Sequence, residues 1–237
     1  MWACHKTHEK VLDLIASLPH EGRLLDMGAG EGPLSARLRD GGCRVVALDV
    51  LAENFAVDDV PLVQADLSRG LPFVAGSFQG LCCLECIEHL EDQFMFIREC
   101  HRLLVSGGWL LISTPNITGL ASRITYLLSA SYPLARKPLN EFSHNPLHDH
   151  INLISYQKLR YILHRNGFRV RTVCTDRLRR SSLSWCFLVP LIRAATTAAM
   201  RGEKDPRQQA ANREIARHLL SVDLLFGRTL IVVAEKT

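Results

Sequence analysis

The sequence of 237 residues predicts an α/β protein built on a doubly wound, mostly parallel sheet. Three observations predict this fold. Short apolar segments alternate with amphipathic ones from residue 22 to residue 116, as strands alternate with helices in such sheets. The predicted strands in this half end on polar residues, at the edge where open parallel sheets bind ligands. About fifty residues separate the last two predicted strands, and so long a connection must contain helices of its own.

Turn residues and apolar periodicity set the elements in order. Pro19 stops a first amphipathic helix, Pro33 suits the first turn of a second one, and Gly41 and Gly42 end it. The predicted helices span residues 11–18, 33–40, 92–104, 117–132 and 155–166, with two more near 183–200 and 207–220. The predicted strands are GRLLDMG, CRVVALDV, VPLVQADL, FQGLCCLE, WLLISTPN, FRVRTVCTD and RTLIVVAEK.

These elements predict a single domain over residues 1–237. Its parts are an N-terminal helix within residues 1–20, a helix and a histidine-rich loop at 117–152, and a helical insertion at 178–226 before the last strand. The predicted strands end on Asp26, Asp49, Asp66, Glu85 and Asn116.

Composition limits the cellular setting. The net charge of +4 is too small by itself to indicate a nucleic-acid partner. The first ten residues, MWACHKTHEK, lack the apolar core of a secretory signal, and no apolar run is long enough to span a membrane. Most of the eight cysteines lie in apolar segments, which is typical of buried thiols in a reducing compartment. We therefore expect a cytoplasmic protein.

The segment LLDMGAGEG, residues 24–32, predicts a ligand in close contact with the backbone. It is not a P-loop, because Pro33 follows the last glycine where a P-loop has lysine. Its G-x-G-x-G spacing is one residue tighter than a dinucleotide fingerprint, and Asp26 precedes it. A carboxylate there would repel a pyrophosphate but attract an ammonium or sulfonium group.

Two further carboxylates describe the rest of the ligand. Asp49 lies nineteen residues after Gly30, where a carboxylate can accept hydrogen bonds from both ribose hydroxyls. Asp66 follows the third predicted strand, where it could accept a bond from an adenine amino group. A ligand with ribose, adenine and a positively charged amino-acid end is S-adenosyl-L-methionine. The predicted cofactor contacts are Asp26, Gly28, Ala29, Gly30, Gly32, Asp49, Val50, Asp66, Leu67 and Glu85.

The sequence resembles the class I S-adenosylmethionine-dependent methyltransferases, in the subgroup similar to the ubiquinone-pathway O-methyltransferases. The segments LLDMGAGEG, ALDV, QADL, FQGLCCLECIEHLED and HRLLVSGGWLLISTPN carry the resemblance over residues 22–116, and HINLISYQKLRYILHRNGFRV carries it more weakly. It implies a seven-stranded sheet whose last strand is antiparallel, and methyl transfer as the activity. The loop spacing disfavours a nicotinamide-dependent dehydrogenase. The intact loop and Asp49 argue against a non-catalytic methyltransferase-like partner protein.

A second motif, ECIEH, follows the fourth predicted strand. If a helical turn starts there, Glu85, Glu88 and His89 converge on one side and suit a divalent cation such as magnesium, manganese or zinc. Small-RNA 2′-O-methyltransferases and some ubiquinone-pathway enzymes carry a similar motif, which a histidine from an Asp-His pair completes. That resemblance implies Glu85, Glu88, His89 and His150 as metal ligands, with His144 and His148 as nearby alternatives.

Many relatives carry a similar motif with no known metal, so a second interpretation stays open. There Glu85 would serve the methionine end of the cofactor, and the other side chains would line the pocket. An oxygen acceptor gains reactivity when it loses its proton, so we expect His89, His150 and Glu88 to be catalytic. The predicted acceptor is a small molecule, either a phenolic quinone precursor or a sugar of a surface glycan. The alternative is an RNA end, although no aromatic and basic platform for RNA is present.

The C-terminal third contains a basic segment followed by an apolar one, a combination found in proteins that bind membranes. Residues 158–180 hold eight lysines and arginines and one acid, Asp176, and SWCFLVPLI follows shortly after. Such a pair of segments can attach a protein to the anionic inner face of a membrane. The alternative is a solvated helix face followed by a buried helix of the insertion, kinked at Pro190. The sequence makes no prediction of the oligomeric state.

Overall fold

The computed structural model describes residues 5–132, 139, 141–142 and 149–237, and these form a sheet of seven strands in the order β3-β2-β1-β4-β5-β7-β6. Strand β7 runs antiparallel to both of its neighbours, whereas β1 to β5 pair in parallel. This confirms the predicted α/β class and the antiparallel last strand. The strands are β1 Arg23–Met27, β2 Arg44–Asp49, β3 Leu62–Gln64, β4 Phe78–Leu84, β5 Leu104–Pro115, β6 Phe168–Cys174 and β7 Thr229–Lys236.

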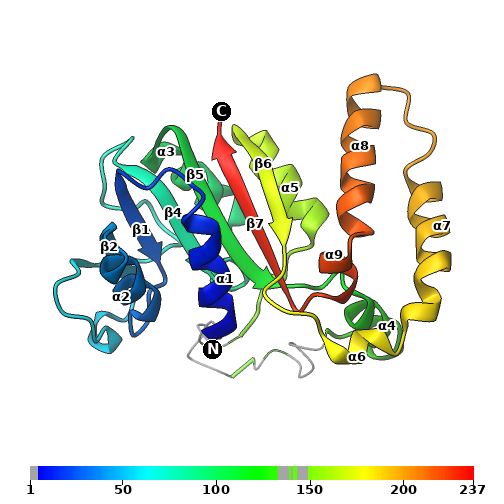
Figure 1. Cartoon of the computed structure of the whole chain (residues 1–237), viewed down its shortest axis with the longest axis horizontal. Helices are drawn as coiled ribbons and strands as arrows, with labels where there is room; N and C mark the ends of the chain where they lie inside the picture. Colours follow the sequence, from blue (N-terminus) through cyan, green and yellow to red (C-terminus); the bar gives the residue numbers. More distant parts are fainter. Residues whose placement is uncertain (1–4, 133–138, 140, 143–148) are drawn as a thin grey trace.

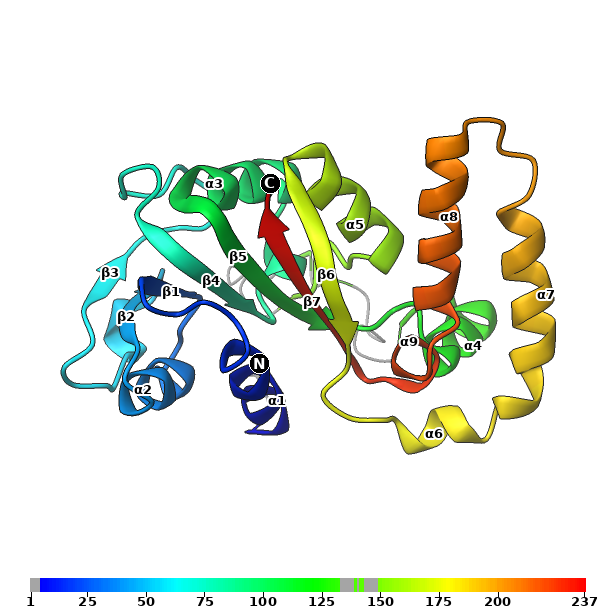
Figure 2. The same cartoon turned by 45° about the horizontal axis from the view of Figure 1, so that its top comes forward.

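Helices cover both faces of the sheet. Figures 1 and 2 show α1 and α2 on one face and α3 and α5 on the other, while α7 and α8 stand beside the sheet. The α-helices are α1 His5–Ile15, α2 Pro33–Asp40, α3 Gln93–Leu103, α4 Leu120–Ser129, α5 Tyr156–Arg165, α6 Arg180–Leu183, α7 Val189–Ala199, α8 Pro206–Leu219 and α9 Val222–Phe226. Three short 3₁₀-helices in the described residues are η1 Ala52–Asn54, η2 Ile87–His89 and η4 Cys186–Leu188.

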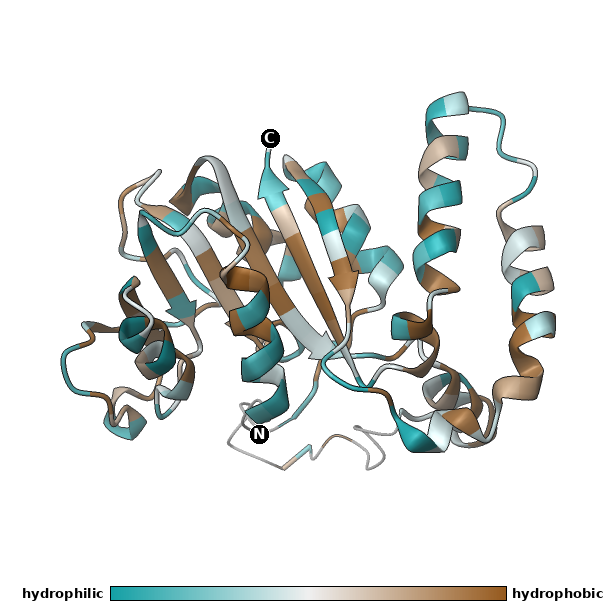
Figure 3. Ribbon diagram, viewed as in Figure 1, coloured by the Kyte–Doolittle hydropathy of each residue, from teal (hydrophilic) through white to brown (hydrophobic). Residues whose placement is uncertain are grey.

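The apolar core has two layers, one on each face of the sheet, which Figure 3 shows as brown central strands. Successive side chains of a strand point to opposite faces, so Leu110 and Ile112 of β5 pack on the layer under α3 and α5. Trp109 and Leu111 pack on the other layer, under α1 and α2. Strands buried on both faces explain why β4 and β5 read as nearly continuous apolar runs.

Several element boundaries differ from the predictions. Strand β3 is only three residues long, and β5 begins at Leu104, the last residue of the predicted helix 92–104. Helix α4 begins at Leu120 rather than at residue 117, because the Asn116 side chain accepts a hydrogen bond from the Thr118 backbone N–H. The Asn116 amide also donates to the carbonyls of Leu224 and Gly227, so this strand-end residue anchors the helical insertion.

Between β6 and β7 the chain forms the helical insertion, α6 to α9 with η4. Helix α8 is tied to α5 by an ion pair of 2.7 Å between the buried Arg160 guanidinium and Glu214. The Tyr156 hydroxyl also hydrogen bonds to His218 of α8. Among the described residues, no helix is both long enough and apolar enough to cross a bilayer.

Candidate functional site

The loop after β1 is built so that only glycine fits at its sharpest points. Gly28, Gly30 and Gly32 all have positive φ, at 73°, 58° and 88°, which other L-residues rarely adopt. A Cβ added at Gly28 would lie 2.2 Å from the sulfur of Cys86, and one at Gly32 would lie 2.5 Å from Val57. The loop therefore packs directly against the start of the ECIEH motif. Ala29, between the first two glycines, is buried.

Asp49, the last residue of β2, is held in place by that loop. Its Oδ2 accepts a bond of 2.8 Å from the Gly30 backbone N–H, and its Oδ1 accepts one of 2.9 Å from Leu51. A carboxylate oxygen has two lone pairs, so each oxygen keeps one for a ligand hydroxyl. The spacing of nineteen residues in the sequence thus corresponds to a direct contact across the carboxyl ends of β1 and β2.

Asp26 of β1 lies beneath the loop and is only 3% exposed. Its Oδ2 accepts a bond of 2.7 Å from the Ser35 hydroxyl of α2. Burial raises the pKa of Asp26 from 3.8 to about 6, and the nearby Asp49 carboxylate raises it further, against the Ser35 hydrogen bond. A positive charge placed above the loop would reverse this shift, which is what a ligand ammonium would do.

The remaining predicted cofactor residues follow β2 and β3 at the same edge. Val50 is 37% exposed directly after Asp49. Asp66 lies two residues beyond β3, where its Oδ1 accepts a bond of 2.8 Å from the Ser68 backbone N–H and its Oδ2 is 3.5 Å from Arg69. Leu67 packs against the core. The Asp66 carboxylate is therefore already shared with its own turn.

Glu85 directly follows β4 in a strained conformation, with φ at 53°. Its backbone N–H donates to the Ser113 carbonyl at 2.9 Å, and its Oε1 accepts a bond of 3.1 Å from the Ser113 hydroxyl. Burial raises the pKa of Glu85, and the Asp176 carboxylate adds to the rise. Glu85 thus lies at the carboxyl edge of the sheet, one residue beyond β4.

Glu88 lies in η2 and is fully buried. Its Oε2 accepts a bond of 3.0 Å from the Thr114 hydroxyl, while Oε1 has no hydrogen-bond partner among the described residues. Burial raises the pKa of Glu88, and the neighbouring Glu85 carboxylate raises it further. Glu85 beside it is half-buried, so a positive charge placed next to the two carboxyl groups would lower both raised pKa values.

The segment 149–152 brings a second histidine to this cluster. The Asn152 backbone N–H donates to the Glu88 carbonyl at 2.9 Å, and the Gln93 side chain donates to the carbonyls of Ile87 and Asn152. The rings of His89 and His150 lie 5.0 Å apart as a result. Two segments sixty residues apart in the chain thus meet at the carboxyl edge of the sheet.

One carboxylate and two imidazoles of this cluster lie close enough together to be candidate metal ligands. Among the described residues, the ligand atoms of Glu88, His89 and His150 all lie within 4.8 Å of one another. Glu85 is not part of this group. The Asp149 carbonyl oxygen lies 2.8 Å from Nδ1 of His89, so Nδ1 donates and the neutral ring carries its lone pair on Nε2. His144 and His148, the alternative ligands, lie outside the described residues.

Sequence reasoning missed three hydroxyl groups of this site. Ser35 holds Asp26, while Ser113 and Thr114, adjacent on β5, hold Glu85 and Glu88 respectively. The available signal was a pair of polar residues at the end of an otherwise apolar strand. Their partners could not be read from the sequence, because they depend on the register in which Leu84 of β4 pairs with Ser113.

Comparison with known sequences places this chain among methyltransferases. A family model described as a methyltransferase domain matches residues 3–173. A probable S-adenosylmethionine-dependent methyltransferase of Mycolicibacterium smegmatis is 31% identical over 169 residues, which are 70% of this chain and 59% of that protein. A ubiquinone biosynthesis O-methyltransferase of Pseudomonas aeruginosa is 32% identical over 106 residues, 40% of this chain and 44% of that protein. The chain thus covers less than two thirds of either relative.

Solved structures share the fold at low sequence identity. A SAM-dependent methyltransferase from Archaeoglobus fulgidus superposes with a TM-score of 0.62, covers 97% of this chain and 93% of its own, and is 18% identical. An S-adenosylmethionine-dependent methyltransferase from Mesorhizobium loti gives a TM-score of 0.56 over 95% of this chain and 96% of its own, with 20% identity. At these identities the likeness shows the fold alone.

Proposed function

Since the chain belongs to the S-adenosylmethionine-dependent methyltransferases, we propose that it transfers the methyl group of that cofactor to an oxygen atom of a small acceptor molecule. The observation that carries this proposal is the cluster of Glu88, His89 and His150 beside the glycine loop. Cys86 packs on Gly28, so the ECIEH motif lies against the loop that the cofactor is expected to occupy. Proton-accepting groups thus lie next to the place where a methyl group would leave.

Each predicted cofactor residue has a role that its surroundings support. Gly28, Ala29, Gly30 and Gly32 let the cofactor approach the backbone, and Asp49 with Val50 binds the ribose. Asp66 and Leu67 bind the adenine, through a carboxylate oxygen and an apolar contact. Asp26 and Glu85 attract the positively charged methionine end, because both are carboxyl groups with a raised pKa that a nearby cation would help to ionise.

Methyl transfer from a sulfonium is an in-line displacement in which the cofactor supplies the reactive group and the protein positions the acceptor. A hydroxyl acceptor loses its proton to a base. Nε2 of His89 is suited to this task, because the Asp149 carbonyl fixes the ring by its bond to Nδ1. His150 lies 5.0 Å away as a second base, and Glu88 stabilises the positive charge that either imidazole gains.

A divalent cation such as magnesium, manganese or zinc fits the same residues. The buried Glu88 Oε1 lacks a hydrogen-bond partner among the described residues, and a cation would satisfy it. Glu88, His89 and His150 would hold the ion, with Glu85 beside them, and it would supply Lewis acidity that lowers the pKa of an acceptor hydroxyl. The mixture of oxygen and nitrogen donors leaves the identity of the metal open.

The acceptor we propose is a phenolic quinone precursor or a sugar of a surface glycan. The similarity to a ubiquinone biosynthesis O-methyltransferase supports the phenol. We place the reaction in the cytoplasm with peripheral contact to the inner face of the membrane, which the apolar segment at 184–192 and the preceding Arg179 and Arg180 support. An RNA end, which the Glu88, His89 and His150 cluster also favours, is the second candidate.

A screen of catechols, sugars and RNA ends tests this proposal. Each acceptor is incubated with radiolabelled S-adenosylmethionine, with and without EDTA, and methylated products are analysed by mass spectrometry. We expect an O-methyl product that Glu88→Gln abolishes, while Glu21→Gln, an exposed control, leaves it unchanged. Full activity in EDTA would show that the reaction needs no divalent cation. A product methylated on nitrogen or carbon would overturn the proposed oxygen acceptor.

A further inference from the structure

The apolar segment of the insertion does not form a buried helix. Among the described residues, η4 and α7 contain no buried side chain, although both are rich in apolar residues. Pro190 lies in the first turn of α7, where it starts the helix rather than kinking it. The buried-helix interpretation of SWCFLVPLI is therefore wrong: Phe187 and Leu191 are exposed, and Leu188, Val189 and Ile192 are half-buried.

Large apolar side chains gather on one surface, formed by α4, α6, η4 and α7, which we call the insertion face. Figures 1 and 2 show α4, α6 and α7 next to one another at one end of the molecule. Leu127 and Leu128 of α4 are 78% and 77% exposed, and Phe187 and Leu191 are both 67% exposed. Clustered apolar exposure of this kind marks an interaction site.

The charge of the insertion face is of one sign. Residues 117–132 and 177–202 contain no aspartate, glutamate or lysine. They contain six arginines: Arg123, Arg177, Arg179, Arg180, Arg193 and Arg201. Arg177 lies 3.7 Å from the carboxylate of Asp176, which directly precedes this range. The remaining excess of positive charge beside exposed apolar groups suits a partner that is both apolar and anionic, and the interface of an acidic lipid bilayer has both properties.

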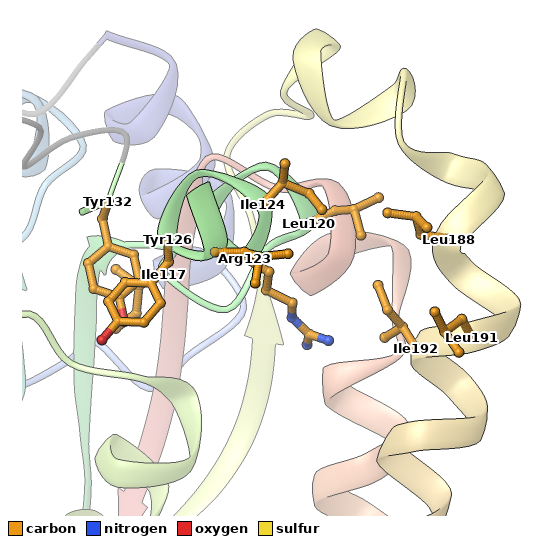
Figure 4. A pocket seen from close by; sticks show the side chains of 10 residues that line it. Ile117, Leu120, Arg123, Ile124, Tyr126, Tyr132, Leu188, Leu191 and Ile192 are labelled. Atoms are coloured by element: carbon orange, nitrogen blue, oxygen red, sulfur yellow. The ribbon is translucent and has the colours of Figure 1, made fainter. Parts of the chain in front are cut away.

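Two cavities open on this face, on either side of α4. The larger, about 520 Å³, lies between α4 and α7 and is lined by apolar and tyrosine side chains and Arg123. Figure 4 shows Arg123 among these side chains, with Tyr126 and Tyr132 on one side and Leu191 and Ile192 on the other. The smaller cavity, about 260 Å³, includes Arg179 and Trp185. Each cavity thus combines an apolar lining with at least one arginine.

Arg123 is placed to bind an anion in the larger cavity. Its Nε donates to the Thr118 carbonyl at 2.7 Å, which anchors the side chain. Among the described residues, no other partner of its guanidinium is found, so four N–H donors remain. Burial lowers the pKa of Arg123, which shows that the charge is partly desolvated without a carboxylate beside it. A phosphate oxygen would offset this cost.

The insertion face adjoins the predicted catalytic edge. Ile117, which lines the larger cavity, is three residues after Thr114, whose hydroxyl holds Glu88. Three residues span at most about 10 Å. A surface bound at this face would therefore lie close to the place where the acceptor is expected to enter.

We propose that the insertion face binds a membrane containing anionic phospholipid, and that the cavity between α4 and α7 takes an acyl chain of one lipid whose phosphate bonds to Arg123. Phe187, Leu127 and Leu191 enter the apolar layer, and the arginines reach the headgroups. This inference deepens the membrane contact in the proposed function and rests on it. It does not depend on which acceptor is methylated.

Co-sedimentation with vesicles tests the proposal. Vesicles of equal parts phosphatidylcholine and phosphatidylglycerol should bind the protein at least about tenfold more tightly than phosphatidylcholine alone, with the difference reduced at high salt. Arg123→Gln should weaken binding about fivefold, and Leu127→Ser with Leu191→Ser roughly tenfold or more. Val74→Ser and Arg98→Gln, exposed controls on other loops and helices, should leave it unchanged.

Tryptophan fluorescence locates the contact. Lipids brominated on their acyl chains should quench the emission of Trp185, and Trp185→Phe should remove the quenched component while Trp109, which is buried, stays unaffected. Absence of binding to anionic vesicles at low salt would overturn the proposal. So would concentration-dependent dimerisation that the double leucine variant abolishes, because a second copy would then cover this face. Titration with S-adenosylhomocysteine on the same preparations separates these outcomes from a failure of the methyltransferase assignment.

Discussion

Replacing Asp26 by asparagine should make the ligand-free protein more stable at neutral pH. Asp26 is buried and its pKa is raised from 3.8 to about 6, chiefly by burial. A pKa raised by folding contributes stability that is fully present below pH 3.8 and is lost as the pH rises through about 6. Asparagine carries no charge at any pH, and its side-chain oxygen can still accept the bond from Ser35.

The size of the effect follows from the two pKa values. Each pH unit between 3.8 and about 6 removes about 1.4 kcal/mol of stability, so the charged Asp26 costs about 3 kcal/mol above pH 6. Part of that loss has already occurred at pH 4. The advantage of Asp26→Asn over the natural protein should therefore grow by roughly 2 to 3 kcal/mol between pH 4 and pH 8.

Urea unfolding of both proteins at pH 4 and pH 8, without ligand, measures this change. All other titrating groups are shared, so their contributions cancel in the difference. Asp58→Asn, at an exposed acid, provides the control for replacing an aspartate by asparagine. If the two proteins differed in free energy of unfolding by the same amount at both pH values, the raised pKa of Asp26 would be refuted.

Three further predictions concern the loop and the cluster. Asp49→Asn should weaken S-adenosylhomocysteine binding by more than ~1 kcal/mol in calorimetry, since it removes charge-assisted bonds to the ribose; an affinity equal to that of Asp58→Asn would count against the ribose role. Gly42→Ala should lower the free energy of unfolding by about 1 kcal/mol, and Gly28→Ala should lower it by more. Both glycines have positive φ, but only a Cβ added at Gly28 would meet another atom closely, the Cys86 sulfur at 2.2 Å. Equal losses would show that the contact with Cys86 is unimportant. Glu88→Gln should weaken Mn²⁺ binding at least about tenfold in electron paramagnetic resonance titrations. A variant that bound Mn²⁺ as tightly as the natural protein would argue against a metal at this cluster.

Local signals predicted much of the fold. Helix α2 matches its predicted span of 33–40, because Pro33 starts it and two glycines end it. Helix α5 begins after Ser155, whose hydroxyl accepts from the Lys158 backbone N–H as a helix cap. The short β3 and the late start of α4 were not predictable from periodicity, since pairing with β2 and the turn at Asn116 decide them.

The candidate site likewise contains residues whose places could be predicted from the sequence and residues whose places could not. Asp49 could be placed beside Gly30 from spacing alone, because the carboxyl ends of neighbouring parallel strands lie together. The burial of Glu88 and its bond to Thr114 depend on the register of β4 and β5. His150 reaches His89 only because Asn152 bonds to the Glu88 carbonyl, a contact with no sequence signature. The exposure of α7 was hidden for another reason: an apolar helix reads the same whether it packs on a core or faces a lipid surface.

Calorimetric titration of the protein with S-adenosylhomocysteine and with NAD tests the central claim most directly. We expect a saturable response to S-adenosylhomocysteine and none to NAD, because Asp26 precedes a G-x-G-x-G loop whose spacing is one residue tighter than a dinucleotide fingerprint. Saturable binding of NAD with no response to S-adenosylhomocysteine would contradict that claim.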